Sequence, residues 1–425
     1  MAWTVTIHKN AGIEGKPYRD YQVSIRFSNR FAGDKAYLDT DRYLVVLDGY
    51  LFNAGDLRQA YRAETTAEAL VAAYEKNGIN WLNELRGSYN GLLYDKQANL
   101  WTIFVDPCGD RPLFYYQDNE ALVVAADYND VVAHLKQIGK TYQANEKAAY
   151  SILTYGYMID AATHIAEIAR LLPGKCLDIR DGRVALRSYF RFENTRTIKI
   201  SFDEAIEQVD ALFRKAVAIS FNKDLENGYR LHLADMSGGL DSRMVSWVAR
   251  DLGFSDITNI CYAQSQSQEW KAAFQVANAL HNDFIYMPLD TCNFVYDVDE
   301  IVQQNYGLAV YIGITGGKRL LSYLNANVFG LEMTGMLGDV VIGAFIKKTG
   351  QNTAPTFNEN RYSNLLRYDF DAAILREYEN SEMFKLYTRG FLGAMSTYMI
   401  RNRFSDVASP FLDVEFFLIL FELTP

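Results

Sequence analysis

The stretch Leu231-His-Leu-Ala-Asp-Met-Ser-Gly-Gly-Leu-Asp-Ser-Arg-Met244 decides the fold of the C-terminal half of this chain. Its first residues predict a buried strand, Ser237-Gly238-Gly239 predicts a sharp turn, and a helix is expected from about Leu240. Two consecutive glycines let a ligand approach bare backbone N–H groups. The helix directs its unsatisfied first-turn amides at the same place. The segment therefore predicts an anion site at the carboxyl end of a strand.

Side chains of the same stretch suit a metal-bridged polyphosphate. Ser237 and Ser242 supply hydroxyl donors, and Asp241 supplies a carboxylate, a preferred ligand of hard cations such as Mg²⁺. A Walker A loop is excluded, because the sequence contains no Gly-x-x-x-x-Gly-Lys-Ser/Thr pattern. A plain Gly-Gly turn is the alternative reading. The full six-residue pattern between strand and helix favours the phosphate site.

Composition limits the classes of function. The 425 residues suffice for two or three domains, and 49% hydrophobic with 22% charged residues is typical of a globular protein. A net charge of −10 disfavours binding to nucleic acid or anionic membranes, and no apolar run approaches the ~20 residues of a membrane helix. No secretion signal is recognisable, and the scattered cysteines favour reduced thiols over disulfides or zinc. We therefore expect a cytoplasmic protein.

The N-terminal part, residues 1–195, is predicted to be a layered α+β domain. Short β-favouring runs bounded by Asp, Gly and Asn turns predict strands, and helical patterns lie between or after them. The predicted strands are 43–47, 88–94, 100–105 and 121–126, the helices 67–76 and 146–155, and a closing hairpin 176–179 with 183–186.

A polar link, residues 193–200, separates this part from a second domain at 201–425. Ser201 and Glu204 predict a capping box at the start of a helix. Apolar residues then recur at helical spacing: Phe202, Ile206, Val209 and Phe213.

The order of several motifs resembles that of the asparagine synthetase B family, which includes β-lactam synthetases and lasso-peptide cyclases. Residues 47–58 resemble the block NGEIYNxxxLR of class II glutamine amidotransferase domains, 87–95 and 106–116 match later blocks, and 171–175 resembles the final turn. The loop 237–242 resembles the pyrophosphate loop of N-type ATP pyrophosphatases, which cleave ATP between its α and β phosphates. The resemblance implies an Ntn-hydrolase-like α+β sandwich, followed by a doubly wound parallel α/β domain of the adenine nucleotide α-hydrolase type.

The resemblance also implies a site for ATP and Mg²⁺. Its nucleotide-binding residues would be Ser237, Gly238, Gly239, Leu240, Asp241, Ser242 and Gly335. The segment 332–345 aligns by length with the family's SGEGADELFGGY, so Asp339 would bind Mg²⁺ together with Asp241. The glutamate that the family uses in its synthetase chemistry is Met336 here, and the Asp-Glu pair is Asp339-Val340. No catalytic residue is therefore assigned.

The N-terminal domain departs from the amidotransferase pattern. That class uses an N-terminal cysteine as its nucleophile, whereas position 2 is Ala2 and the first cysteine is Cys108. The Asn and Glu that would bind glutamine are Asp48 and Tyr50. The resemblance thus implies a domain retained as a scaffold without glutaminase activity.

The end of the sequence leaves two alternatives. Residues 405–415 resemble the family's RVPFLD segment, which lines the active cleft. Family members continue through helices that carry a lysine for charged intermediates, whereas this sequence ends at Pro425. Either the domain is truncated, or the lysine is absent or supplied otherwise.

Other positions allow two readings each. Ser265-x-Ser267-x-Glu269 either lies where the family contacts adenine and ribose or caps a helix at 270–280. Lys318-Arg319 either touches phosphate or, in the favoured reading, is solvated at the surface. Tyr306 and Tyr311 lie where the family's acceptor pocket would form, although most aromatic residues belong to the core.

We expect an ATP-dependent carbon–nitrogen ligase that adenylates a small-molecule or peptide carboxylate and joins it to an amine or ammonia. The intact loop and Asp339 favour this function. The alternative is a non-catalytic or regulatory relative that binds nucleotide or a carrier or peptide partner, and Met336 and Val340 favour it. The same departures disfavour an ordinary asparagine synthetase, so natural-product or polysaccharide tailoring is expected. A homodimer, or a carrier or precursor-peptide partner, fits either function.

Overall fold

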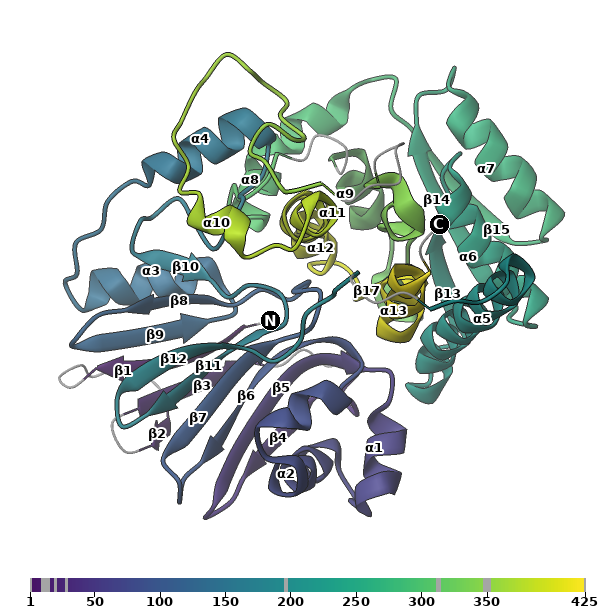
Figure 1. Cartoon of the computed structure of the whole chain (residues 1–425). Coiled ribbons are helices and arrows are strands. Elements are labelled where there is room, and N and C mark those ends of the chain that lie inside the picture. The colour runs from purple at the N-terminus through teal and green to yellow at the C-terminus, as the bar shows by residue number, and fades with distance from the viewer. Residues whose placement is uncertain are drawn as a thin grey trace. The chain divides into compact units, whose positions relative to one another are not determined.

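The chain divides into two compact units (Figure 1). The first comprises Met1–Arg191 with Asn360–Asp371, and the second comprises Phe192–Glu359 with Ala372–Pro425. The computed structural model describes residues 2–8, 16–18, 21–26, 30–194, 198–310, 315–346 and 353–423. Part of the polar link, residues 195–197, lies outside these ranges, as do Tyr311 and Pro425.

Among its described residues, the first unit has two sheets of six strands each, and every strand pairing in them is antiparallel. One sheet has the order β10 (Ile168–Arg170), β8 (Phe114–Gln117), β9 (Ala121–Ala125), β1 (Ala2–His8), β3 (Tyr21–Arg26), β2 (Lys16–Tyr18). The other has the order β12 (Arg183–Ser188), β11 (Lys175–Arg180), β7 (Leu100–Val105), β6 (Gly87–Asp95), β5 (Tyr43–Leu51), β4 (Ala36–Asp39). The predicted strands and the closing hairpin are confirmed.

The two sheets share one core, which makes this unit a layered α+β structure. Val23 and Val124 of the first sheet belong to the same buried cluster as Val46 and Trp101 of the second. Helices α1 (Ala54–Tyr61) and α2 (Thr66–Asn77) cover the other face of the second sheet, where Leu70 packs with residues of β5. The unit also contains α3 (Tyr128–Gln137) and α4 (Glu146–Tyr155), the latter as predicted.

The segment 360–371 belongs to the first unit, although most of the second unit precedes it in the sequence. The Tyr362 N–H donates a hydrogen bond to the Thr154 carbonyl at 2.8 Å. The ring of Tyr368 stacks on that of Tyr150, with centroids 4.8 Å apart. These contacts at the end of α4 were not predicted from the sequence.

The second unit is built on a parallel sheet, which in the described part of the chain has the strand order β15-β14-β13-β16-β17. The strands are β13 (Leu231–Asp235), β14 (Ile257–Ala263), β15 (Asp283–Pro288), β16 (Phe329–Met333) and β17 (Val407–Ala408). The first strand of this unit, β13, is central: the chain adds β14 and β15 on one side and then β16 on the other. The order reverses between β13 and β16, where ligands bind in open α/β sheets.

Helices cover both faces of this sheet, so the doubly wound arrangement is confirmed for this unit. Leu320 of α9 packs with Leu233 and Ile260 on one face, and Ala273 of α7 packs with Met236 on the other. The helices are α5 (Phe202–Glu226), α6 (Leu240–Asp251), α7 (Gln268–Ala279), α8 (Val298–Gln304), α9 (Thr315–Ser322), α10 (Ala373–Arg376), α11 (Ser381–Lys385), α12 (Ser396–Arg401) and α13 (Val414–Glu422).

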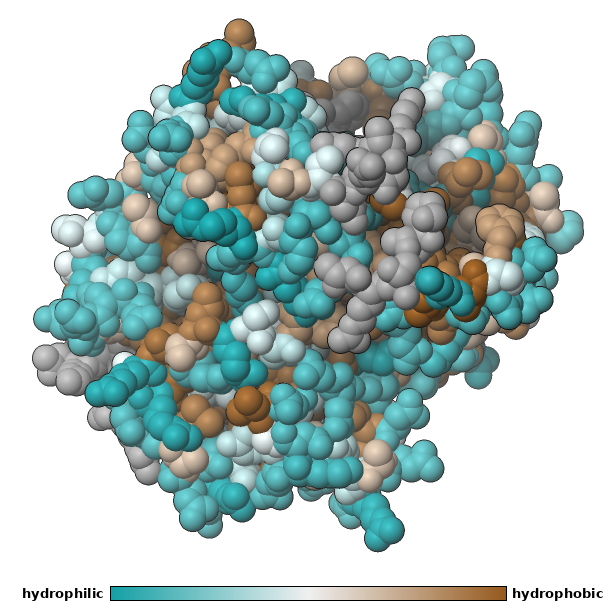
Figure 2. All heavy atoms as spheres, viewed as in Figure 1, coloured by the Kyte–Doolittle hydropathy of each residue, from teal (hydrophilic) through white to brown (hydrophobic). Residues whose placement is uncertain are grey.

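No helix in the described ranges combines the length and the apolar character needed to cross a membrane. Hydrophilic side chains occupy much of the face seen in Figure 2.

The first helix of the second unit, α5, begins and ends with defined hydrogen bonds. At its start, Ser201 and Glu204 form the predicted capping box. Near its end, the fully buried Asp224 carboxylate accepts from the Leu331 N–H at 2.7 Å and lies 2.6 Å from Nδ1 of His232. Asp224 therefore fastens α5 to both β16 and β13. A Cβ at Gly330 would lie 2.1 Å from the Asp224 side chain, so this close approach requires glycine.

The substitution Gly330→Ala is expected to lower the free energy of unfolding by about 1–3 kcal/mol, because the added methyl group collides with Asp224. Gly55→Ala in α1 is the matched control, since a Cβ there meets nothing within 4 Å and alanine is the better helix former. Urea unfolding followed by circular dichroism measures both. A Gly330→Ala protein that unfolds at the wild-type urea concentration would contradict this account of the tether.

Candidate nucleotide-binding site

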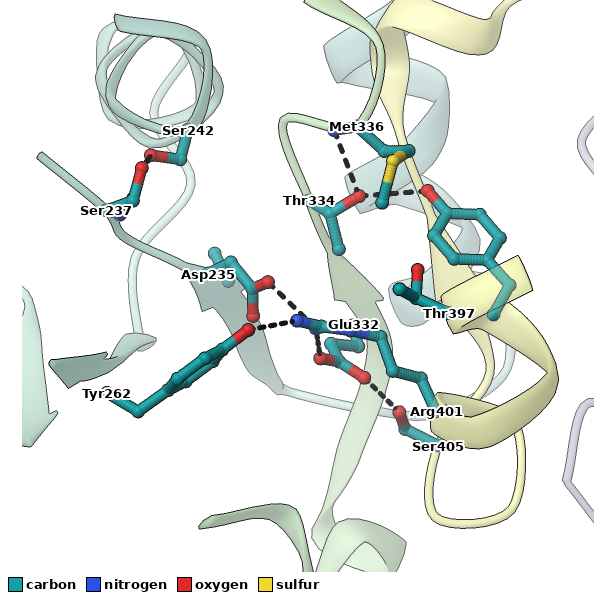
Figure 3. A network of polar contacts seen from close by, with 12 residues as sticks. Asp235, Ser237, Ser242, Tyr262, Glu332, Thr334, Met336, Thr397, Arg401 and Ser405 are labelled. Atoms are coloured by element: carbon teal, nitrogen blue, oxygen red, sulfur yellow. Dashed lines mark hydrogen bonds and ion pairs between the residues drawn. The ribbon is translucent and has the colours of Figure 1, made fainter. Parts of the chain in front are cut away.

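The loop after β13 is closed by its two serines. The Ser237 N–H donates to Ser242 Oγ at 2.9 Å, and the two hydroxyl oxygens lie 3.0 Å apart (Figure 3). The Gly239 N–H donates to Ser237 Oγ at 3.1 Å. The serines predicted as ligand donors thus also hold the loop in a fixed turn.

The start of α6 is open to a ligand. Gly239 precedes the helix and provides no side-chain cap, so no side chain of that residue accepts from the first-turn N–H groups. Gly239 is exposed, and the Leu240 side chain is 70% exposed. Gly238 packs on α7, because a Cβ there would lie 2.9 Å from the Cα of Glu269. The loop therefore presents backbone donors and a helix N-terminus, as the anion-site prediction requires.

A second loop, which follows β16, contacts the first one directly. A Cβ at Gly335 would lie 2.5 Å from the Ser242 nitrogen, and a Cβ at Gly338 would lie 2.6 Å from Asp241 Cγ. Both positions require glycine for this reason. The structure thus brings the predicted residues Gly335 and Asp339 to the Ser237–Ser242 loop, from neighbouring strands.

Asp241 and Asp339 form a pair of neighbouring carboxylates. Burial raises the pKa of the Asp241 carboxyl, and the nearby Asp339 charge raises it further, while a hydrogen bond from the Asp339 backbone opposes both. Among the described residues, no group of three or more His, Cys, Asp or Glu side chains could hold a metal ion by itself. Two carboxylates suit Mg²⁺ when phosphate oxygens supply further ligands. The donor set therefore fits a metal that arrives with a nucleotide.

A cavity of about 440 Å³ adjoins the loop at the carboxyl ends of β13 and β14. Its lining includes Asp235, Ser237, Ile260, Tyr262, Ser267 and Glu269. Its size is within the range of small-molecule pockets. A nucleotide with its phosphates on the loop has space for its base and ribose here.

Of the positions with two readings, the structure bears on Ser267 and on Lys318-Arg319. Ser267 Oγ accepts from the Glu269 N–H at 2.9 Å, so the capping interpretation of that serine is confirmed. The surface expectation is wrong for Lys318, which is buried and ion-paired with Glu300. The Arg319 side chain is 31% exposed and pairs with Asp297 at 3.3 Å.

Sequence reasoning missed a buried ion cluster close to the two loops, shown in Figure 3. Arg401 of α12 pairs with Asp235 Oδ2 at 2.8 Å and with Glu332, and it donates to the Tyr262 hydroxyl at 3.1 Å. Ser405 Oγ donates to Glu332. We call these five residues the Arg401 cluster. A carboxylate within each of two apolar strands was the available signal, because a buried charge needs a partner.

The cluster holds two carboxylates and one guanidinium. Burial raises the pKa of Asp235 to about 7; Arg401 opposes this rise, and Glu332 adds to it. Glu332 is fully buried, and Arg401 is 5% exposed.

The altered positions of the first unit are buried and engaged with their neighbours. Asp48 Oδ2 lies 4.0 Å from Arg111 Nη1, and the Arg111 guanidinium lies over the Tyr50 ring, 5.7 Å from its centroid. Arg111 Nε also donates to Ser88 Oγ at 2.9 Å. Tyr50 is 2% exposed, so its ring fills space inside the unit.

Comparison with known proteins identifies the relatives of this chain. The sequence model of the glutamine amidotransferase domain matches residues 33–190. The chain is 21% identical over 279 residues to asparagine synthetase [glutamine-hydrolyzing] 1 of Bacillus subtilis. The aligned region covers 64% of this chain and 43% of that protein. Asparagine synthetase [glutamine-hydrolyzing] 2 of the same organism is 21% identical over 269 residues, or 59% of this chain and 35% of that protein.

Among solved structures, a glutamine phosphoribosylpyrophosphate amidotransferase from B. subtilis aligns with a TM-score of 0.29 and 15% identity, over 67% of this chain and 59% of that one. The domain match lies within the first unit. The domain match and the sequence relatives confirm the predicted resemblance to the asparagine synthetase family. The chain spans less than half the length of the two Bacillus relatives.

Asp235 is expected to contribute a stabilisation that is lost as the pH rises from about 4 to about 7. Its pKa is higher in the folded protein than the ordinary value of 3.8. The folded state therefore retains a proton that the unfolded state has released, and this contribution is lost as the pH passes the folded pKa.

Urea unfolding at several pH values measures this contribution, which Asp235→Asn should remove. Asp203→Asn, at an exposed position of α5, is the control and should leave the pH dependence unchanged. An Asp235→Asn protein with the wild-type pH dependence would show that Asp235 does not titrate in this range.

Proposed function

We propose that this protein is an ATP-dependent carbon–nitrogen ligase, which activates a substrate carboxylate with Mg·ATP and joins it to an amine or ammonia. The observation that carries the proposal is the direct contact between the Ser237–Ser242 loop and the Gly335–Asp339 loop. The contact lies where the strand order reverses, and it combines an open helix N-terminus with two carboxylates. The names of the Bacillus relatives, both asparagine synthetases, support an amide-forming reaction.

The proposed reaction has two steps. A carboxylate oxygen of the substrate attacks the α-phosphorus of ATP, the bond to the bridging oxygen of the β-phosphate breaks, and pyrophosphate leaves. An amine then attacks the acyl carbon, AMP leaves, and the amine loses a proton. The N–H groups at the start of α6 would bind phosphate oxygens and stabilise the charge on the leaving group.

Asp241 and Asp339 would hold the Mg²⁺ ion, and when bound it would neutralise phosphate charge. The cavity next to the loop would take the base and ribose. The proposed acceptor is a small-molecule or peptide carboxylate.

We further propose that the first unit, an Ntn-hydrolase-like sandwich, does not hydrolyse glutamine. Asp48 and Tyr50 stand where the family binds glutamine, and both are buried against Arg111. Neither residue is of the type, Asn or Glu, that binds glutamine in the family at these positions. Ammonia or an amine would then come from solution or from the substrate itself.

The second candidate is a nucleotide-binding relative without turnover. Met336 favours it, because a thioether cannot replace the carboxylate that the family has at this position. Val340, which is buried, likewise supplies no ligand oxygen. The products formed from ATP distinguish the two candidates.

Asp241→Ala and Asp339→Ala are each expected to weaken binding of Mg·ATP at least about tenfold, because each removes a proposed metal ligand. Asp251→Ala, at the far end of α6, is the matched control and should bind normally. Isothermal titration measures affinity, and chromatography of the nucleotides identifies the products. AMP with pyrophosphate supports the ligase, ADP with phosphate contradicts it, and binding without any product supports the second candidate.

Incubation with glutamine should release no glutamate, since Asp48 and Tyr50 replace the Asn and Glu that bind glutamine in the family. An amide product should form with ammonium chloride or an amine, and not with glutamine alone. An enzymatic glutamate assay measures the first quantity and mass spectrometry the second. Glutamate release above that of the heat-treated protein would contradict this part of the proposal.

A further inference from the structure

The Arg401 cluster joins the three strands that surround the candidate site. Asp235 is the last residue of β13, Tyr262 lies near the end of β14, and Glu332 lies near the end of β16. These strands are neighbours in the sheet. Arg401 reaches all three from α12, which is outside the sheet (Figure 3). One guanidinium therefore connects three strand ends that each continue toward the nucleotide site or its cavity.

Two of these strand ends lead directly into the loops of the site. Asp235 is separated from Ser237 by one residue, and Glu332 precedes Gly335 by three positions. The loops then supply Asp241 and Asp339, respectively. Any sliding of β13 against β16 would therefore change the separation of these two carboxylates.

The backbone pairing between β13 and β16 is irregular. Leu231 pairs with Phe329, but Leu233 pairs with Glu332, so the register shifts within a short ladder. The extra residue at such an irregularity stays unpaired and locally disrupts the ladder. The Arg401 cluster lies just beyond this irregularity, toward the loops, and supplies side-chain contacts that define the register there.

Stability alone does not account for such a cluster. Burying charges is costly, and an apolar replacement of a buried ion pair is often equally stable or more stable. The guanidinium, however, is planar and binds in fixed directions, whereas a lysine ammonium is a single point of charge. Arg401 thus contributes geometry that an apolar side chain or a lysine would not.

We propose that Arg401 is a positioning residue of the nucleotide site, which sets the separation of the two loops that carry Asp241 and Asp339. This inference rests on the proposed function, because it assumes that the two carboxylates share one Mg²⁺ ion with ATP. Arg401 contacts neither carboxylate itself; it acts through Asp235 and Glu332.

The test compares ATP affinity with and without the metal. Nucleotide binding in EDTA depends on the first loop and the cavity, whereas the gain in affinity with Mg²⁺ depends on both loops. In Arg401→Lys, this gain should fall at least about tenfold, while the affinity in EDTA falls by a smaller factor, because Asp235 and Tyr262 also line the cavity. Isothermal titration of ATP into the full chain measures both, and Arg403→Lys, at an exposed position two residues further on, should change neither.

A second variant tests the proposal without leaving an unpaired buried charge in the protein. The combination Arg401→Met, Asp235→Asn, Glu332→Gln removes all three charges and leaves no carboxylate unpaired. In this variant, Mg²⁺ should increase the ATP affinity as little as it does in Arg401→Lys. Its circular dichroism spectrum should be that of the wild-type protein.

Three results would overturn the positioning role of Arg401. A folded variant could keep the wild-type gain of ATP affinity with Mg²⁺, or a variant could lose ATP affinity equally with and without Mg²⁺. Unfolding of both variants would be the third such result. A wild-type protein that binds no ATP under either condition would overturn the proposed function and this inference together. Normal wild-type binding with unaffected variants would overturn the inference alone.

Discussion

The second unit depends on the close contact between the loop after β13 and the loop after β16. At Gly335 and Gly338 the backbone of one loop lies against Ser242 and Asp241 of the other, closer than any side chain would permit. Other contacts of the unit hold the two loops in this position. The serine contacts close the first loop, Asp224 ties α5 to both strands, and the Arg401 cluster joins their ends. A doubly wound sheet supplies the place, because the strand order reverses between β13 and β16. The glycines allow carboxylates on separate loops to become neighbours.

Local patterns in the sequence were sufficient for part of the elements and for the position of the candidate site. The alternation of apolar and turn residues located β5, β6, β7, β9, β11 and β12, since those patterns reflect burial on a sheet, but β1–β4, β8 and β10 were not predicted. The capping box at Ser201 located the start of α5, since its hydrogen bonds are local. The Gly-Gly loop located the helix N-terminus for the same reason. Asp339 came from resemblance to a family rather than from local chemistry, and the structure places it beside Asp241.

The features that were missed depend on contacts between residues far apart in the sequence. Arg401 is distant from Asp235 along the chain, and nothing local to either residue indicates the other. Lys318 illustrates the opposite error: a charged residue in a polar stretch suggests the surface, yet paired carboxylates on a neighbouring helix allow it to be buried. The return of segment 360–371 to the first unit was invisible for the same reason, since Tyr368 finds its partner Tyr150 only in the folded protein.

That returning segment has a consequence for the order of folding during synthesis. The first unit draws on residues up to Asp371, so its structure cannot be complete when Arg191 leaves the ribosome. The strands of the two sheets can pair early, because they lie within the first part of the chain. The ring of Tyr150, however, must wait for Tyr368 while β13, β14, β15 and β16 are synthesised. The first unit is therefore completed only after the strands that carry the candidate nucleotide site have been synthesised.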